Sequence, residues 1–343
     1  MSSLNAAAAS MASMRDVAER AGVSIGTVSN FLNRPDKVSP ATASRVAAAI
    51  TDLGFVRNDA ARQLRAGHSR AIGLIVLDFR NPFFSELAIG AEERAREGGY
   101  VIVLGNSDEK SDLEASYLDL FEEQRMRGVL ITPFGDVEAR LRRLKHRGIP
   151  AVLVDRVSST SEFSSVSVDD VAGGRLAAEH LIGIGRKRIA FVGGPLSIRQ
   201  VQDRLLGLQQ VVGLHPTVRV EVLTSNSLSV LEGRRLGAQI ASRSPRERPD
   251  AIFAANDLLA LGTLQALVMS SKIRVPKDIA LVGYDDIQFA SGAIVPLTSV
   301  RQPTARLGRS AVEVLLDEAE RGIEPGLELV FAPELIVRGS TTD

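Results

Sequence analysis

The chain has 343 residues, with 41 basic and 41 acidic side chains, four histidines, and neither cysteine nor tryptophan. Its length predicts two or three folded units, and its 45% hydrophobic residues are enough for large cores. The lack of cysteine excludes a disulfide scaffold, a thiol nucleophile and a thiolate metal site, and no apolar run is long enough for a membrane span.

The charges are unevenly distributed along the chain. Between Met14 and Arg70 there are 9 basic and 5 acidic residues, so residues 71–343 hold the other 32 basic and 36 acidic ones. The net charge is therefore +4 on residues 14–70 and −4 on residues 71–343, and the two cancel in the whole chain. This modest asymmetry favours a polyanionic partner, such as nucleic acid, for the N-terminal part.

Residues 1–13 are rich in alanine and serine and show no periodicity. A secretory signal would need a basic start before its apolar stretch, but the first basic residue, Arg15, follows the alanine run. We expect a disordered extension or leader here and a cytoplasmic protein.

Residues 14–57 predict three short helices, because apolar residues recur at helical spacing between clear start and stop signals. In chain order, Gly22-Val23 is expected to end the first helix, and Ser24 to cap a second helix over Ile25–Leu32. Ser39-Pro40 is expected to begin the third helix, and Gly54 to end it. Two short helices joined by a tight turn, with a third behind them, form a helix-turn-helix.

After Arg70, short apolar runs alternate with amphipathic stretches. The runs are Ile72–Leu77, Tyr100–Leu104, Val129–Ile131, Ala151–Val154, Ile189–Val192, Ala251–Ala254 and Ile279–Val282. The helical stretches include Phe83–Glu97, Ala172–Ile184 and Leu258–Ser270. This alternation predicts parallel sheets covered by helices, and it is too long for one sheet. We expect two α/β lobes with a ligand cleft where the carboxyl ends of their strands meet.

Several short strings share their order and spacing with one known family. They are Met14-Arg15-Asp16-Val17-Ala18, Ala21-Gly22-Val23-Ser24, Thr27-Val28-Ser29, Leu32-Asn33, Ala61-Arg62 with Leu64, Asn81-Pro82-Phe83-Phe84, Ala255-Asn256-Asp257, Gly283-Tyr284-Asp285-Asp286 and Val337-Arg338-Gly339-Ser340-Thr341. Together they cover nearly the whole chain, which resembles the LacI/GalR family of bacterial transcription regulators.

The resemblance implies an α/β protein with an N-terminal three-helix helix-turn-helix headpiece, a hinge helix, and a two-lobed core of two doubly wound parallel sheets like periplasmic binding proteins. The expected divisions are a leader at 1–13, the headpiece at 14–57, a hinge at 58–70 and an effector-binding and dimerisation core at 71–343. In that core we expect one lobe at about 71–169 and 303–330 and the other at about 170–302 and 331–343.

The second headpiece helix is expected to enter the major groove of DNA. By resemblance, Ile25, Gly26 and Asn30 would set sequence preference: Asn30 can pair with adenine, Ile25 can contact a thymine methyl group, and Gly26 offers no side chain. Ser24, Thr27 and Asn33 look like phosphate-positioning residues. The alternatives are a core position for Ile25 and a simply exposed one for Asn30.

Residues 58–65 match the family's hinge helix. The resemblance assigns DNA contacts to Asn58, Ala61, Leu64 and Arg65, with Leu64 as an apolar wedge in the minor groove. A buried linker leucine is the alternative. Phe55 and Arg57 depart from the family's usual tyrosine and proline.

The resemblance also assigns effector-binding residues in the cleft: Phe83, Phe84, Asp155, Asp169, Arg204, Asn256 and Asp285. Carboxylates, an amide and a guanidinium suit the hydroxyl groups of a sugar-like ligand, and phenylalanine rings suit its apolar face. The alternatives are that Asp285 and Asp286 only end a strand and that Phe84 is a core residue.

We therefore predict a repressor that binds a pseudo-palindromic operator in double-stranded DNA as a homodimer, switched by a small-molecule effector. The prediction includes no enzyme activity, cofactor, metal or membrane partner, because the histidines lack metal-ligand spacing and no nucleophile elbow or P-loop is present. The alternatives are a solute-binding protein delivering a sugar to a transporter, which would lack DNA affinity, and a sugar-processing enzyme, which would turn its ligand over.

Overall fold

The computed structural model describes residues 12–55, 68–158, 160–271 and 273–342. The chain divides into two compact units, residues 1–67 and 68–343. None of the helices in the described ranges is both long enough and apolar enough to cross a membrane.

In its described residues, 12–55, the first unit contains three α-helices and one 3₁₀ turn around a small core. Its elements are α1 (Met14–Ala21), α2 (Ile25–Asn33), η1 (Pro35–Lys37) and α3 (Pro40–Leu53). Val17, Val28 and Val46 are completely buried and join the three helices. The order of elements confirms the predicted helix-turn-helix.

Local signals begin and end these helices. Ser13, which we assigned to the leader, instead caps α1: its backbone N–H and its hydroxyl both donate to Asp16, and the hydroxyl accepts from the backbone N–H of Asp16. Gly22 and Gly54 both adopt the left-handed conformation, with φ of 62° and 57°, and end α1 and α3.

The second unit consists of two lobes, each built on a six-stranded sheet. The first sheet has the order β11-β5-β4-β3-β1-β2 and the second has β12-β10-β9-β8-β6-β7. The strands are β1 (Ala71–Val76), β2 (Val101–Asn106), β3 (Gly128–Ile131), β4 (Ala151–Val154), β5 (Ser164–Val168), β6 (Arg188–Gly193), β7 (Arg219–Thr224), β8 (Ala251–Ala254), β9 (Ala280–Asp285), β10 (Thr298–Arg301), β11 (Glu328–Phe331) and β12 (Glu334–Ile336). All neighbouring pairs are parallel except β10 with β12.

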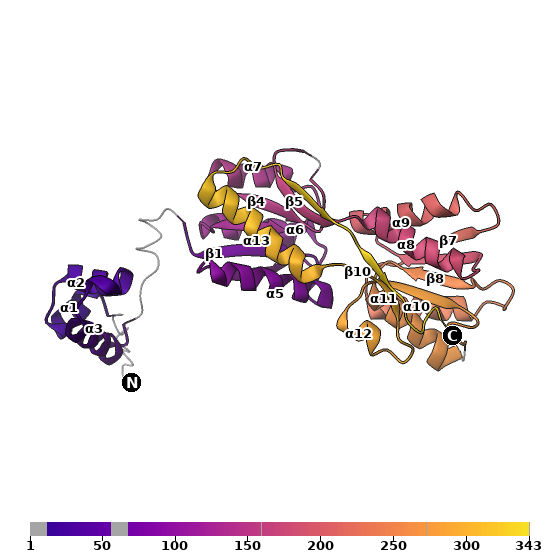
Figure 1. Cartoon of the computed structure of the whole chain (residues 1–343), viewed down its shortest axis with the longest axis horizontal. Coiled ribbons are helices and arrows are strands. Elements are labelled where there is room, and N and C mark those ends of the chain that lie inside the picture. Colours follow the sequence, from indigo (N-terminus) through magenta and orange to yellow (C-terminus); the bar gives the residue numbers. More distant parts are fainter. Residues whose placement is uncertain (1–11, 56–67, 159, 272, 343) are drawn as a thin grey trace, which may run out of the picture. The chain divides into compact units, whose positions relative to one another are not determined.

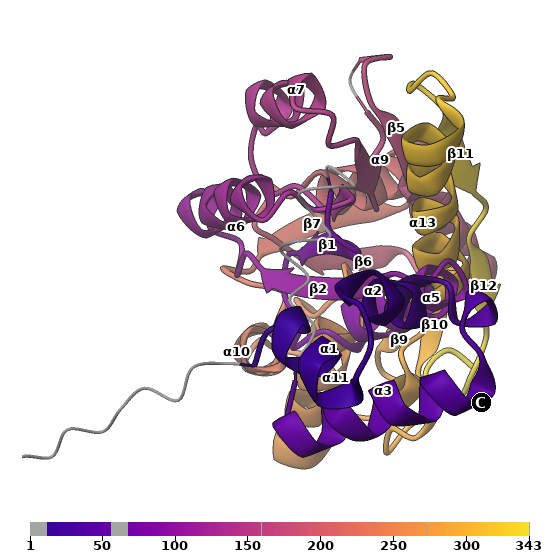
Figure 2. The ribbon, with the colours of Figure 1, turned by 90° about the vertical axis from the view of Figure 1, so that its left-hand side faces the viewer.

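Helices cover both faces of each sheet. They are α5 (Pro82–Glu97), α6 (Ser111–Glu123), α7 (Glu138–His146), α8 (Asp170–Gly183), α9 (Arg199–Val212), α10 (Val230–Ala241), α11 (Asp257–Gln265), η2 (Ala266–Ser270), α12 (Gln288–Ser291) and α13 (Thr304–Arg321). Figure 2 shows α6 and α7 on one side of the first sheet and α5 and α13 on the other. Because β11 and α13 return to the first lobe, the chain passes between the lobes after β5, after β10 and after β11 (Figure 1).

Three helix pairs approach each other closely through glycines. A Cβ atom on Gly90 of α5 would lie 2.1 Å from the carbonyl oxygen of Ala305, and one on Gly308 of α13 would lie 2.0 Å from that of Leu87. The α8–α9 and α10–α11 pairs repeat this arrangement with two glycines each, Gly174 with Gly207 and Gly233 with Gly262. Any side chain at these positions would separate the backbones.

Each predicted apolar run lies in a strand except for one end residue in three of them, Leu77, Tyr100 and Ile279, and the fold class is confirmed. The helix expected over Leu258–Ser270 instead ends as an α-helix at Gln265 and continues as the π-helical turn η2. Strands β5, β7, β10, β11 and β12 were not predicted. β5 is fully buried but contains three serines, and β7 is an edge strand of mixed polarity, so neither forms an apolar run.

Candidate functional site

The exposed side of α2 carries the three residues assigned to base recognition. Ile25, Gly26 and Asn30 are all exposed, and Ile25 retains 44% of its accessible surface. The opposite side of the helix carries the buried Val28. Ile25 is therefore not a core residue of the described unit, and an exposed isoleucine at a helix start is available to a partner.

The three residues assigned to phosphate positioning form local hydrogen bonds. The Ser24 hydroxyl accepts from the backbone N–H of Thr27 at 3.1 Å and lies 2.9 Å from the Thr27 hydroxyl. Asn33 donates from Nδ2 to the backbone oxygen of Ser29 at 2.8 Å. These contacts orient the side chains while leaving all three at or near the surface. Asn58, Ala61, Leu64 and Arg65 lie outside the described residues and stay predictions.

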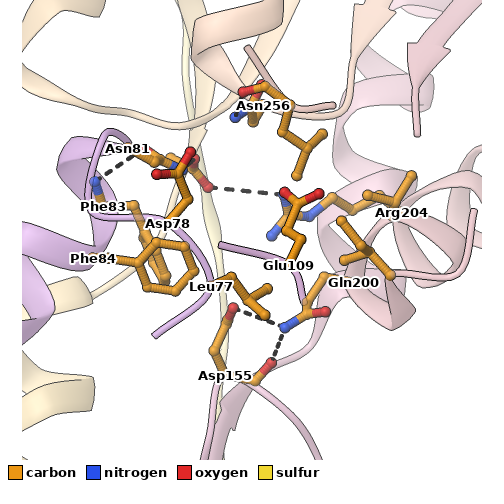
Figure 3. A pocket seen from close by; sticks show the side chains of 14 residues that line it. Leu77, Asp78, Asn81, Phe83, Phe84, Glu109, Asp155, Gln200, Arg204 and Asn256 are labelled. Atoms are coloured by element: carbon orange, nitrogen blue, oxygen red, sulfur yellow. Dashed lines mark hydrogen bonds and ion pairs between the residues drawn. The ribbon is translucent and has the colours of Figure 1, made fainter. Parts of the chain in front are cut away.

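A cavity lies between the two lobes of the second unit, at the carboxyl ends of their strands (Figure 3). The empty space at this position is about 470 Å³, a figure that includes space open to solvent. Six of the seven predicted effector residues line it: Phe83, Phe84, Asp155, Arg204, Asn256 and Asp285. Asp169 does not join them: it caps α8, where it accepts from the backbone N–H of Ala172 at 2.7 Å.

The phenylalanines project from the first turn of α5, where Asn81 caps the helix and Pro82 begins it. Their rings pack edge to face with centroids 5.0 Å apart. Both are more than nine-tenths buried, so Phe84 is a core residue and a wall of the cavity at once. Figure 3 shows the two rings at the first-lobe side of the cavity, where an apolar ligand face can rest.

Arg204 is held by its own protein on several sides. Its Nε donates to Asp170 at 2.8 Å, its Nη1 donates to the carbonyl oxygen of Ala255 at 2.7 Å, and the guanidinium carbon lies 3.7 Å from the ring centre of Tyr284. Nη1 is also 3.8 Å from Asp285. The Arg204 guanidinium, which we expected to face a ligand, thus makes most of its contacts with groups of the protein itself.

Asp285 joins the lobes at the end of β9. Its carboxylate accepts from Nδ2 of Asn81 in the first lobe at 3.1 Å and from Nε2 of Gln302 at 2.8 Å. Its backbone φ of 102° is unusual for a non-glycine residue and turns the chain sharply after the strand. Asp285 therefore both ends the strand and lines the cavity.

A second contact between the lobes lies on the other side of the cavity. Gln200 of α9 donates from Nε2 to the backbone oxygen of Asp155 at 2.6 Å and to its carboxylate at 2.9 Å. The other carboxylate oxygen of Asp155, Oδ1, is buried and has no hydrogen-bond partner in the described part of the chain. Asp155 thus retains one acceptor for a ligand donor.

Burial governs the ionisation of these groups. It raises the pKa of Asp155 well above its usual value, reinforced by Asp170, and it raises the pKa of Asp285 to about 6 against the opposing effect of Arg204. Burial alone would lower the pKa of Arg204, but the neighbouring carboxylates raise it, so the guanidinium stays charged.

Asn256 contributes to the cavity while capping α11. Its Oδ1 accepts from the backbone N–H of Leu259 at 2.9 Å, and its Nδ2 donates to the backbone oxygen of Leu228 at 3.2 Å. One amide hydrogen and one oxygen lone pair remain for other contacts.

Sequence reasoning missed several lining residues. They are Leu77, Asp78, Asn81, Glu109, Ile198, Gln200, Val201 and Leu228. Asn81 belongs to a string already singled out, so its place before the two phenylalanines could have identified it. Nothing local marks Gln200 or Glu109, which reach the cavity only through the tertiary fold. In the described ranges, no three acidic or histidine side chains are grouped as a metal site.

Comparisons with known proteins agree with this architecture. Residues 13–58 match the family of bacterial regulatory proteins of the lacI type, and residues 178–341 match the periplasmic binding protein-like domain. The chain is 32% identical over 335 residues to the HTH-type transcriptional repressor PurR of Vibrio vulnificus, covering 96% of this chain and 98% of that protein. It is 34% identical to the ribose operon repressor of Bacillus subtilis, covering 89% and 91%.

Solved structures show the same likeness. The lac repressor dimer bound to operator and the anti-inducer ONPF superposes with a TM-score of 0.84 at 28% identity, covering 97% of this chain and all of that one. A LacI family regulator from Enterococcus faecium with bound ribose superposes with a TM-score of 0.72 at 26% identity, covering 79% of this chain and 98% of that one. With a lacI-type headpiece, a periplasmic-binding-protein-like core and full-length relatives, the chain belongs to the LacI family of bacterial regulatory proteins.

Proposed function

We propose that this protein is a transcriptional repressor that binds a pseudo-palindromic operator as a homodimer. A small effector either releases it from the operator or increases its affinity for the operator. The observation that carries the proposal is the combination, in one chain, of a helix-turn-helix with an exposed recognition surface and an interlobe cavity lined by both polar and apolar side chains. The headpiece disfavours a solute-binding protein. We also propose that the protein acts in the cytoplasm and, when bound to DNA, at the nucleoid.

We propose a polyhydroxylated metabolite of sugar size as the effector. Asp155 and Asp285 offer acceptors for hydroxyl groups, Asn256 offers both a donor and an acceptor, and the two phenylalanines offer an apolar wall. The ribose operon repressor and the ribose-bound regulator among its relatives support a sugar. Asp169 is no longer included, because it caps α8 away from the cavity lining.

The switch is proposed to work through the contacts that join the lobes. The Asn81–Asp285 and Gln200–Asp155 hydrogen bonds both cross the cavity region. A ligand that bonds to these groups changes the free energy of closing the lobes against one another. That change is the differential interaction through which an effector can alter DNA binding.

Homodimerisation is supported by apolar side chains left exposed on both lobes. In the first lobe they lie on α5, β2 and α6, and in the second on α10, η2 and α12: Ile89, Val101, Leu104, Leu113, Leu120, Leu231, Met269 and Phe289. Solvent-exposed apolar groups of this number favour burial against a partner of the same kind.

The test is operator selection followed by base substitution. Wild-type protein should select a two-fold symmetric site from random DNA, and Asn30→Ala should relax preference at one base pair per half-site by about 1–3 kcal/mol. Asn226→Ala, a matched substitution at an exposed site in the second unit, should leave the profile unchanged. Failure to select any symmetric site would refute the proposed function. An unchanged profile for Asn30→Ala would remove only that residue from base recognition.

A further inference from the structure

The lining of the interlobe cavity contains more acidic than basic side chains. Four carboxylates line it, from Asp78, Glu109, Asp155 and Asp285, against the single cation Arg204. Arg204 is already bonded to Asp170, which lies outside that set, and to the carbonyl oxygen of Ala255. The one positive group therefore has little capacity left to balance a negatively charged ligand.

Two acidic residues beside the first-lobe wall have cations of their own. Arg80 donates from Nε to both oxygens of Asp78 at 2.8 and 3.0 Å, and from Nη2 to Asp108 at 2.5 Å. Lys110 donates to the other oxygen of Asp108 at 2.6 Å. These ion pairs partly offset the charges of Asp78 and Asp108 and hold the loop that follows β2.

Glu109 differs from Asp78 and Asp108. Its carboxylate forms no hydrogen bond or ion pair within the described ranges, although it lies between residues that do. Burial raises the pKa of Glu109, and the charges of Asp78 and Asp108 add to this effect against the opposing charge of Arg80. Figure 3 shows its side chain extending into the ring of lining residues from the first lobe.

The backbone conformation of the loop directs the Glu109 side chain toward the cavity. Asp108 and Glu109 have φ values of 51° and 55°, two successive left-handed residues that are not glycine. Such a conformation persists only where the surroundings hold it, and here the ion pairs of Asp108 and the Lys110 N–H bond to the oxygen of Ser107 do so. The loop thus presents one uncompensated carboxylate to the ligand space.

We infer that Glu109 is a specificity residue which accepts a hydroxyl hydrogen bond from an uncharged polyol and excludes its phosphorylated or carboxylated derivatives. The inference rests on the proposed effector function and narrows its ligand class. A phosphate group in the cavity would meet Glu109 at short range without a free cation to offset the repulsion. A neutral sugar would instead satisfy the carboxylate with a charge-assisted hydrogen bond.

The experiment measures binding to full-length protein at pH 8 by calorimetry, using D-ribose, D-glucose and the terminal phosphate ester of each. Wild-type protein should bind at least one parent sugar and bind its phosphate ester far more weakly. In Glu109→Gln, which keeps the side-chain shape and an acceptor oxygen, the ratio of the two dissociation constants should fall about tenfold or more. Most of the change should come from tighter binding of the ester.

Glu123→Gln is the matched control, because Glu123 is an exposed carboxylate on α6 of the same lobe. It should leave the ratio unchanged, and neither variant should melt below the wild-type temperature. A parent sugar that binds while the ratio stays at its wild-type value in Glu109→Gln would overturn the specificity role and leave the effector function intact. Binding of no parent sugar by any of the proteins would overturn the proposed effector class together with this inference.

Discussion

The Ser24 hydroxyl caps α2 and at the same time lies at the end of the helix expected to approach DNA. A carboxylate is as good an N-cap as a hydroxyl, and its charge suits a helix N-terminus. Ser24→Asp should therefore leave the melting temperature of the headpiece at or above its wild-type value. If Ser24 lies against a phosphate, the same change should weaken operator binding by about tenfold or more.

The control for this prediction is Ser39→Asp, which makes the same change at the N-cap of α3. Thermal unfolding and a fluorescence-anisotropy titration with operator DNA measure the two effects separately. Equal losses of affinity in both variants would show that Ser24 contributes only general charge and not a local phosphate contact.

Asp285 predicts a pH dependence of stability. Its pKa is about 6 in the folded protein against an ordinary 3.8, so its contribution to the free energy of unfolding is fully present below about pH 4 and is lost as the pH rises through 6. The loss corresponds to about 3 kcal/mol. Asp285→Asn cannot ionise, so its stability relative to wild type should increase by up to that amount between pH 4 and 7.

Urea denaturation of the ligand-free proteins across this pH range checks the prediction. Asp136→Asn, at an exposed position, should follow the wild-type curve at a constant offset. A constant offset for Asp285→Asn as well would mean that the carboxyl of Asp285 is ionised at the same pH in the folded and unfolded chains.

At the level of elements, the cavity depends on how closely α8 and α9 approach. A Cβ atom on Gly174 would lie 2.1 Å from the carbonyl oxygen of Arg204, the same residue whose side chain forms the charged centre of the cavity. Gly174→Ala should force the helices apart, destabilise the second lobe by about 1–3 kcal/mol and weaken effector binding. Chemical denaturation and ligand titration report the two effects.

Gly183 of the same helix provides the control. A Cβ atom there meets nothing within 4 Å, so Gly183→Ala should stay within about 0.5 kcal/mol of wild type and keep effector affinity. Comparable destabilisation in the two variants would show that the close approach of α8 and α9 at Gly174 does not determine the result.

At the level of the whole molecule, the edge strand β2 predicts where two subunits meet in the dimer. β2 ends the first sheet, and its Leu104 and Val101 are 48% and 59% exposed. An uncovered apolar edge strand is a liability that a second subunit would remove. Leu104→Glu should therefore convert the protein to monomers and weaken operator binding by about 100-fold, because two headpieces no longer bind as one unit.

Sedimentation velocity and a DNA titration test this prediction, and effector affinity should persist because the cavity lies within one chain. Leu206→Glu places the same charge on the exposed side of α9 and should leave the dimer intact. A dimer that survives Leu104→Glu would place the subunit interface elsewhere.

The sequence by itself determined the features that depend on neighbours a few residues apart. Helix caps at Ser24 and Ser39, stop signals at Gly22 and Gly54, and the apolar runs of the central strands are such features, and the structure reproduces them. Through the family resemblance it also marked six residues of the cavity, four of which lie in the shared strings: Phe83, Phe84, Asn256 and Asp285.

Only the tertiary structure decided which partners these residues meet. Asn81 and Asp285 are 204 positions apart, and their hydrogen bond exists because two lobes bring the ends of their strands together. Asp169 caps its own helix, and Asp170 binds the guanidinium of Arg204. Glu109 lines the cavity without a hydrogen bond or ion pair to any other described residue. The physical reason is that burial and electrostatic balance depend on all surrounding elements, whereas caps and periodicity depend on one.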